Sequence, residues 1–103
     1  MKKLVVALLA VGVSVGTQAA EFTVGQKGKE FSVKTLDIKV GDTVNFTNDD
    51  PFAHNVFSVS DVKSFDLGSY PQGQTKSVTF DKPGVVEVEC SIHPNMQMVV
   101  NVK

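Results

Sequence analysis

The sequence has no arginine, no tryptophan and a single cysteine among its 103 residues. Its ten positively charged side chains are all lysines, against eleven acidic residues. This slightly acidic balance argues against nucleic acids or anionic lipids as partners. One cysteine cannot form a disulfide bond within the chain, so the thiol of Cys90 must be buried and unreactive, paired with another chain, or bound to a metal ion.

The sequence also lacks an apolar run long enough to span a bilayer comfortably. An uncharged, mostly apolar segment, residues 4–15, follows two lysines, and small residues then lead to Ala20. This is the layout of a secretory signal peptide. Cleavage after Ala19 puts small residues at both positions that determine cleavage, whereas cleavage after Ala20 puts Gln18 at one of them. Cleavage after Ala19 is therefore favoured, and cleavage after Ala20 is the alternative.

Removal of a signal peptide of residues 1–19 would leave one domain, residues 20–103, with eight lysines and eleven acidic residues. A domain of this size has room for a single modest core. We expect it to be exported to the periplasm, to keep no membrane anchor after cleavage, and to be monomeric.

Apolar residues alternate with polar ones through most of residues 21–103, and Gly, Pro, Asn and Asp separate the runs. This pattern predicts about eight short strands in an all-β fold, a Greek-key sandwich or barrel. The alternating residues are Phe22 and Val24; Phe31 and Val33; Leu36, Ile38 and Val40; Val44 and Phe46; Phe57 and Val59; Val78 and Phe80; Val86 and Val88; and Met98, Val100 and Val102.

Two stretches depart from regular alternation. The inward set changes from odd to even numbers near Lys34 and Thr35, which predicts a bulge, a change of sheet, or two separate strands. Residues 60–70 have the least regular pattern, and we expect one turn of helix or a loop there.

The residues that carry chemistry lie mostly near the C-terminus. Cys90 is in phase with the two apolar valines of the preceding strand, so its sulfur should point into the protein. The loop that follows contains His93 and Met96, and the only other histidine is His54. A thiolate, two imidazoles and a thioether match a trigonal copper site with a weak axial Met. Zinc is the competing metal, but structural zinc sites favour more thiolates, and a thioether is a poor zinc ligand.

The sequence resembles the cupredoxins, the type 1 blue copper proteins that include plastocyanin, pseudoazurin and amicyanin. The resemblance rests on the run C-x-x-H-x-x-M from Cys90 to Met96, on the pair His54-Asn55, and on the strand Gly-Val-Val-Glu-Val-Glu before the cysteine. It covers nearly all of residues 21–103. It implies a cupredoxin-like fold that holds one copper ion, cycling between Cu(I) and Cu(II).

The resemblance also implies a role for individual residues. His54, Cys90 and His93 would be the strong copper ligands. Asn55 would connect the two ligand-bearing loops, because its backbone amide would donate to the Cys90 sulfur and its side chain would bond near Ser91. Such contacts around the ligands fix their positions and tune the metal.

The axial ligand is ambiguous. Plastocyanin and pseudoazurin have the methionine five residues after the loop histidine, which here is Met98, whereas amicyanin has it three residues after, which is Met96. Met98 is in phase with Val100 and Val102 and fits the core of the last strand. Family members also have seven residues between the ligand and the end of that strand, as Met96 has here. Met96 is therefore favoured, and Met98 is the alternative.

The favoured function is transfer of one electron at a time between partner proteins, because the predicted ligands close the site and leave no position for a substrate. The resemblance implies that the electron leaves through the edge of His93, beside Pro94, where redox partner proteins would dock transiently. An enzyme is not expected, because copper oxidases and nitrite reductases need additional histidine-rich centres. The alternative function is a periplasmic copper carrier or delivery protein without redox shuttling.

Three aromatic residues near these segments, Phe52, Phe65 and Tyr70, are expected to pack in the core or in loops. Shielding of the metal is the less favoured role for them.

Overall fold

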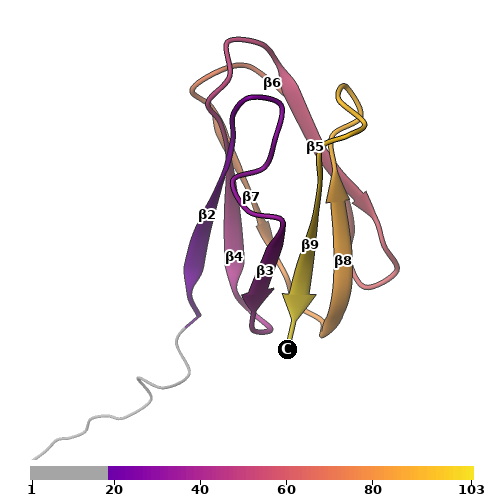
Figure 1. Ribbon diagram of the computed structural model, residues 1–103. Helices are drawn as coiled ribbons and strands as arrows, with labels where there is room; N and C mark the ends of the chain where they lie inside the picture. The colour runs from indigo at the N-terminus through magenta and orange to yellow at the C-terminus, as the bar shows by residue number, and fades with distance from the viewer. Residues whose placement is uncertain (1–18) are drawn as a thin grey trace, which may run out of the picture.

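The computed structural model describes residues 19–103 and contains eight strands and no helix in that range (Figure 1). The predicted signal peptide, apart from its last residue, lies outside the described residues. The strands are β2 (Glu21–Gln26), β3 (Thr35–Ile38), β4 (Thr43–Asn48), β5 (His54–Val59), β6 (Ser64–Tyr70), β7 (Thr75–Thr79), β8 (Gly84–Glu89) and β9 (Gln97–Val102). Between residues 19 and 103, no helix has the length and apolarity needed to cross a membrane.

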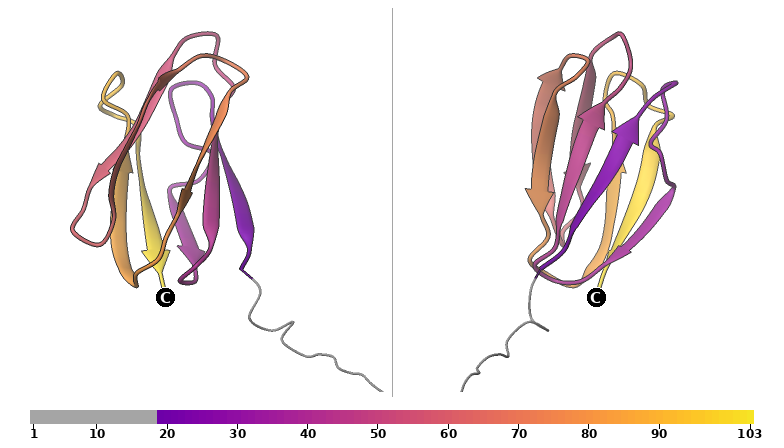
Figure 2. Two further views of the ribbon diagram at one scale, coloured as in Figure 1. Left: turned by 180° about the vertical axis from the view of Figure 1, so that it is seen from behind. Right: turned by 90° about the vertical axis from the view of Figure 1, so that its left-hand side faces the viewer.

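The strands form two sheets that pack face to face as a sandwich (Figures 1 and 2). One sheet has three strands in the order β2-β4-β7, and the other has five in the order β3-β9-β8-β5-β6. Two neighbouring pairs are parallel, β2 with β4 and β3 with β9, and the others are antiparallel. The predicted all-β sandwich of about eight short strands is confirmed.

One apolar core fills the space between the sheets. Alternation places every second side chain of a strand inward, as β8 shows with its buried Val86 and Val88 and its exposed Glu87. The buried apolar residues are Val24, Phe31, Ile38, Val44, Phe46, Val56, Tyr70, Val78, Phe80, Val86, Val88, Cys90, Met96, Met98, Val100 and Val102. The predicted phase of Cys90 with the valines of β8 is therefore confirmed.

The break near Lys34 and Thr35 is a change of sheet. Phe31 makes an isolated bridge to Gln26 at the end of β2, whereas β3 pairs with β9 in the five-stranded sheet. The chain crosses between the sheets here, so the expected strand around Phe31 shrinks to that single bridge. The expectation that Val33 and Val40 face inward is wrong, since they are 37% and 46% exposed.

The middle of the chain holds two further differences from the predicted pattern. In β5 the inward residues are Val56 and Ser58, and Val59 is 74% exposed, because the pairing with β6 shifts register after Asn55. Residues 64–70 form strand β6 rather than a helical turn or a loop. β6 lies at the edge of its sheet, and all of its residues except Tyr70 are exposed or only partly buried, so the alternation is weak in the sequence.

The topology brings two distant segments together at one end of the sandwich. β8 lies between β9 and β5 in the sheet, and it runs antiparallel to β5. The end of β8 therefore lies beside the start of β5. The β8–β9 loop extends from this end, whereas the C-terminus and the start of β2 lie at the opposite end (Figure 1).

Candidate metal site

Three candidate ligands meet at the end of the sandwich that carries the β8–β9 loop. Nδ1 of His54 lies 3.7 Å from Sγ of Cys90, and Nδ1 of His93 lies 3.8 Å from that sulfur. The two Nδ1 atoms are 3.2 Å apart. His54 and Cys90 are buried, whereas His93 is partly exposed. The cluster is the one group of His, Cys, Asp and Glu donors within residues 19–103 that could hold a metal ion.

These separations fit three ligands of one metal ion. Nitrogen and sulfur donors bind a divalent ion of this size at about 2.0 and 2.3 Å, which puts neighbouring donors roughly 3.3–3.7 Å apart in a trigonal or tetrahedral arrangement. The three observed separations agree with that range to within about 0.1 Å. Two imidazoles and one thiolate also match the donor chemistry of a copper site.

Asn55 connects the two segments that bear these donors. Its backbone amide donates to Sγ of Cys90 at 3.4 Å. Its side-chain oxygen accepts from the amide and the hydroxyl of Ser91, at 3.0 and 2.7 Å, and its side-chain nitrogen donates to Asp66 at 3.0 Å. The side-chain oxygen of Asn55 thus holds the start of β5 against the residue that follows Cys90, and its side-chain nitrogen connects β5 to β6.

Asp50 is a site residue that the sequence analysis missed. Its Oδ2 lies 2.7 Å from Nε2 of His54, and both side chains are almost fully buried. A carboxylate accepts this bond, so it selects the tautomer in which Nε2 of His54 carries the proton. The lone pair of Nδ1 is then directed at the sulfur and the other imidazole. A carboxylate behind a ligating histidine fixes the ring and increases its basicity.

The carboxylate of Asp50 is itself held by the loop between β2 and β3. Its Oδ1 accepts from the amide of Gly28 at 2.7 Å, and its Oδ2 accepts from the amide of Lys29 at 3.1 Å. Burial alone would raise the pKa of Asp50. The hydrogen bonds from His54 and the two amides outweigh burial and hold the pKa below its ordinary value. Asp50 is therefore a carboxylate at neutral pH.

Asn48 shapes the loop that carries Asp50. Its Oδ1 accepts from the amide of Asp50 at 2.9 Å, and its Nδ2 donates to the carbonyls of Phe52 and Tyr70, both at 2.9 Å. An Asn that bonds the backbone two residues on is typical of a turn. The same turn presents the acid to the histidine four residues later.

His93 lies on the β8–β9 loop and closes the exposed side of the cluster. Burial lowers the pKa of His93, and the neighbouring His54 and Lys29 lower it further. At neutral pH its imidazole is therefore uncharged, which is the form that binds a metal.

The loop is closed by two backbone hydrogen bonds around Met96. Its amide donates to the carbonyl of His93 at 2.9 Å, and its carbonyl accepts from the amide of Cys90 at 3.3 Å. The Met96 side chain is 1% exposed although it belongs to the loop. Met98 lies in β9 opposite Val88, and its side chain is part of the core. Both methionines are thus buried, Met98 within a strand and Met96 within the loop that also carries His93.

Phe52 covers the two histidines from the solvent side. Its ring centroid lies 5.4 Å from that of His54 and 5.3 Å from that of His93, and the Lys29 ammonium lies 5.6 Å from the Phe52 centroid. Phe52 is 38% exposed, so its packing is against the imidazoles rather than in the core. The less favoured sequence interpretation, shielding of the metal, fits this residue. Phe65 and Tyr70 pack against the core as predicted.

Tyr70 supports the site from the neighbouring strand, since it pairs with His54 in the β5–β6 ladder. Its hydroxyl donates to the carbonyl of Phe46 at 2.9 Å and accepts from Nε2 of Gln26 at 3.0 Å. Burial raises the pKa of Tyr70 to about 12.

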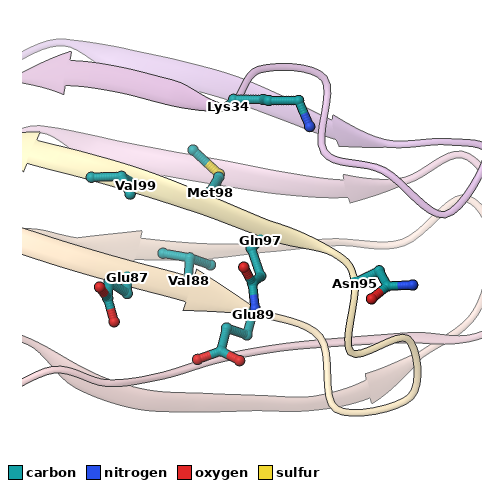
Figure 3. A pocket seen from close by; sticks show the side chains of 8 residues that line it. All are labelled: Lys34, Glu87, Val88, Glu89, Asn95, Gln97, Met98 and Val99. Carbon is teal, nitrogen blue, oxygen red and sulfur yellow. The ribbon is translucent and has the colours of Figure 1, made fainter.

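The surface also has a groove of about 370 Å³ along β8 and β9 (Figure 3). Its lining includes Glu87, Glu89, Gln97 and Lys34 and none of the three clustered donors. The groove follows the outer face of the sheet, where polar side chains meet solvent, and it is separate from the donor cluster.

Comparisons with known proteins agree with this geometry. A sequence model of copper-binding proteins of the plastocyanin/azurin family matches residues 18–103. The methylamine utilization protein MauL of Methylorubrum extorquens is 33% identical over 85 residues, which cover 82% of this chain and 75% of that protein. A reduced amicyanin variant superimposes with a TM-score of 0.73 at 30% identity, over 79% of this chain and 80% of that one.

A copper-containing nitrite reductase from Thermus scotoductus matches in a different way. It superimposes with a TM-score of 0.74 at 32% identity and covers 92% of this chain, but this chain covers only 25% of the reductase. The fold, the donor cluster and the match over residues 18–103 agree with one another. The chain belongs to the plastocyanin/azurin family of copper-binding proteins, and its cofactor is copper.

Proposed function

We propose that this protein is an exported carrier that passes one electron at a time between partner proteins. His54, Cys90 and His93 would hold the copper ion, with Met96 as the weak axial ligand. The observation that carries the proposal is that the three donors already stand at ligand spacing and are held there by hydrogen bonds from the strands behind them. A site that does not rearrange when its charge changes is suited to electron transfer.

Each donor has a separate restraint. Asp50 fixes the ring of His54 through Nε2, Asn55 donates to the sulfur of Cys90, and the loop bond from Met96 to the carbonyl of His93 fixes the third ligand. Such restraints give a site the same geometry in both oxidation states of its metal.

Copper, when bound, supplies the chemistry, because it changes between Cu(I) and Cu(II) with the gain or loss of one electron. The protein residues hold and enclose it. The thiolate of Cys90 favours Cu(I), and the imidazoles of His54 and His93 suit both states. Phe52 packs against both imidazoles and restricts access of water to them.

The exit for the electron would be His93, because it is the partly exposed member of the cluster. Its neighbours Ile92 and Pro94 are exposed on the same loop, and Phe52 adds an exposed apolar ring beside it. A small apolar surface around the exit suits brief docking of partner proteins without tight binding. Docking would be by the monomer.

An enzymatic role has less support. Both histidines of the chain belong to the donor cluster, so this chain offers no histidines for a second copper centre. The remaining candidate is a copper delivery protein, whose site must release the metal. The buried donors and their restraints favour retention of the metal over release.

Export completes the proposal. The sequence from the lysines at the start to Ala20 has the layout of a signal peptide, and we propose that residues 1–19 are removed and that residues 20–103 act in the periplasm.

The test is a redox titration of the copper-loaded chain that begins at Ala20, followed by visible and electron paramagnetic resonance spectra. We expect a reversible one-electron change with copper retained through repeated cycles, even beside a Cu(I) chelator. Met96→Ala should change the spectrum and the potential, and Met98→Ala, the matched control, should leave both close to wild type. Rapid loss of copper to the chelator on reduction would favour the delivery protein instead.

A further inference from the structure

A contact at the start of β2 is not part of the metal site. The backbone nitrogen of Ala20 donates to Oδ1 of Asp42 at 2.9 Å, and the carbonyl of Ala20 accepts from the amide of Thr43 at 3.0 Å. The other oxygen of Asp42, Oδ2, accepts from the amide of Lys39 at 2.9 Å. The start of β2 and the connection between β3 and β4 lie at the end of the sandwich opposite the β8–β9 loop (Figures 1 and 2).

Asp42 is a charged residue with an unusual environment. It is only 5% exposed, and within residues 19–103 it has no ion-pair partner, since the ion pairs there involve other acids. Its two oxygens accept from two neutral backbone amides. A buried carboxylate is more stable when a positive charge lies against it. One of its two donors, the Ala20 nitrogen, is an atom that becomes positively charged if the chain is cut directly before it.

We propose that cleavage between Ala19 and Ala20 creates an α-ammonium group on Ala20 that pairs with Asp42 and anchors the first strand of the mature protein. A signal peptidase supplies the catalyst and water is the co-reactant. Water adds across the Ala19–Ala20 bond: Ala19 leaves with a carboxylate, and the nitrogen of Ala20 gains protons and becomes an ammonium group. The neutral contact to Asp42 then becomes a charge-assisted one, which is the stronger kind.

The pair of the Ala20 ammonium group and the Asp42 carboxylate, called the anchor below, distinguishes the two possible cleavage sites. Cleavage after Ala20 would remove the nitrogen that donates to Asp42 and the carbonyl that accepts from Thr43. Cleavage after Ala19 keeps both contacts. β2 lies at the edge of the three-stranded sheet beside β4, so an anchor at Ala20, directly before its first residue, would hold the pairing in register.

The anchor predicts a pH dependence with a definite sign. Hydrogen bonds from Ala20 and Lys39 hold the pKa of Asp42 below its ordinary value, so Asp42 is charged near neutral pH. An unfolded α-amino group has a pKa of about 7.7–8.0, and the nearby carboxylate raises it in the folded protein. The contribution to stability is therefore complete below about pH 7.7 and is lost as the pH rises through the folded pKa.

Other charged groups surround the new terminus. Asp37 of β3, Lys39 and Asp42 of the β3–β4 turn, and Lys103 after β9 line the groove that contains Ala20, and Glu21 is the next residue of the chain. A chain in which the α-amino group is moved away from Asp42 therefore serves to separate its contribution from that of these groups.

This inference rests on the export proposed above but not on electron transfer. The experiment measures the α-amino pKa by NMR in three chains: one that begins at Ala20, the same chain with Asp42→Asn, and one with a single Gly added before Ala20. In the Gly-extended chain the nitrogen of Ala20 is again a neutral amide that can donate to Asp42, and the charged α-ammonium group lies one residue further away, so this chain is the matched control. Mass spectrometry of the exported full-length chain then gives the site of cleavage.

We expect the α-amino pKa of the chain that begins at Ala20 to lie about half a unit to one unit above 7.7–8.0, a three- to tenfold gain in proton affinity. Asp42→Asn should remove the increase. The urea midpoint should fall from pH 7 to pH 9 in the chain that begins at Ala20 and stay level in the Gly-extended chain. An α-amino pKa equal to that of a short peptide, the same alkaline fall in both chains, or an exported chain that begins at Glu21 would overturn the anchor. None of these results would bear on redox cycling.

Discussion

The contact between Asp50 and His54 allows a quantitative prediction about copper binding. We consider Asp50→Ala, which removes the acceptor that lies 2.7 Å from Nε2 of His54. Without it the buried imidazole can protonate at either nitrogen and is held less firmly. The amides of Gly28 and Lys29 also lose the partner that they share with the histidine.

The expected magnitude follows from that geometry. A hydrogen bond to a charged group contributes about 1.5–3 kcal/mol, and about 1.4 kcal/mol corresponds to a factor of ten. Loss of the Asp50 bond should therefore weaken copper binding by about 10- to 100-fold, the range typical of carboxylates behind ligating histidines. Cu(II) should be weakened more than Cu(I), because the lost group is an anion. The reduction potential should therefore rise.

The assay is a competition titration against chelators for Cu(II) and Cu(I), together with a potential measurement. Asp49→Asn is the matched control, because Asp49 is an exposed neighbouring residue whose carboxylate accepts a hydrogen bond from the Thr47 hydroxyl and, within residues 19–103, makes none with His54. Nitrogen-15 NMR of the metal-free protein should also show His54 as the Nε2-protonated tautomer, and a mixture of tautomers in Asp50→Ala. Unchanged affinity, potential and tautomer in Asp50→Ala would refute the role assigned to this carboxylate.

Three further predictions concern the metal-free protein. Burial lowers the pKa of His93 below 6.5, so the unfolded chain binds this proton more readily and the free energy of unfolding should fall as the pH drops below about 6.5. Urea titrations at several pH values should show a weaker pH dependence of this free energy for His93→Ala, and an identical pH dependence would contradict the assignment. Tyr70 is the sole tyrosine and should ionise at about pH 12 in an ultraviolet titration. Because its folded pKa is raised, its contribution to stability should be complete below about pH 10 and be lost as the pH rises through about 12. Ionisation at the ordinary pKa would count against its burial. Gly84 has φ +139°, and an added Cβ would lie 2.5 Å from Val62, so Gly84→Ala should lower the free energy of unfolding by about 1–3 kcal/mol. Adding Val62→Ala to the same chain should restore part of this loss. If it restores nothing, the clash with Val62 is refuted and the backbone conformation alone causes the loss.

The strands that the sequence predicts well are those buried on one regular face. β8 shows this most clearly, because Val86, Val88 and Cys90 alternate with acidic residues and all three are buried. The weak predictions fall where the chain does not follow a single face. Val33 and Val40 lie on either side of β3, near the crossing between sheets, and Val59 follows a register shift, so each is exposed despite its apolar side chain.

The sequence likewise predicts only part of the metal site. Residue type and spacing identify His54, Cys90 and His93 as donors, and the structure places them at ligand spacing. Asp50 could not be identified in the same way, because a carboxylate in an Asn-Asp-Asp-Pro segment has the ordinary composition of a turn. Its role depends on a loop from another part of the chain, residues 28–29, that fixes its orientation. The spacing of four residues between Asp50 and His54 was the available signal.

The central claim is that one copper ion is bound by the sulfur of Cys90 together with the imidazoles of His54 and His93. The most direct measurement is a copper titration of the chain that begins at Ala20, followed by the intense visible absorption of a copper–thiolate bond. We predict saturation at one copper per chain, with loss of the absorption in Cys90→Ser and its strong alteration in His54→Ala. Copper binding without that absorption, or the same spectrum in Cys90→Ser, would contradict the account.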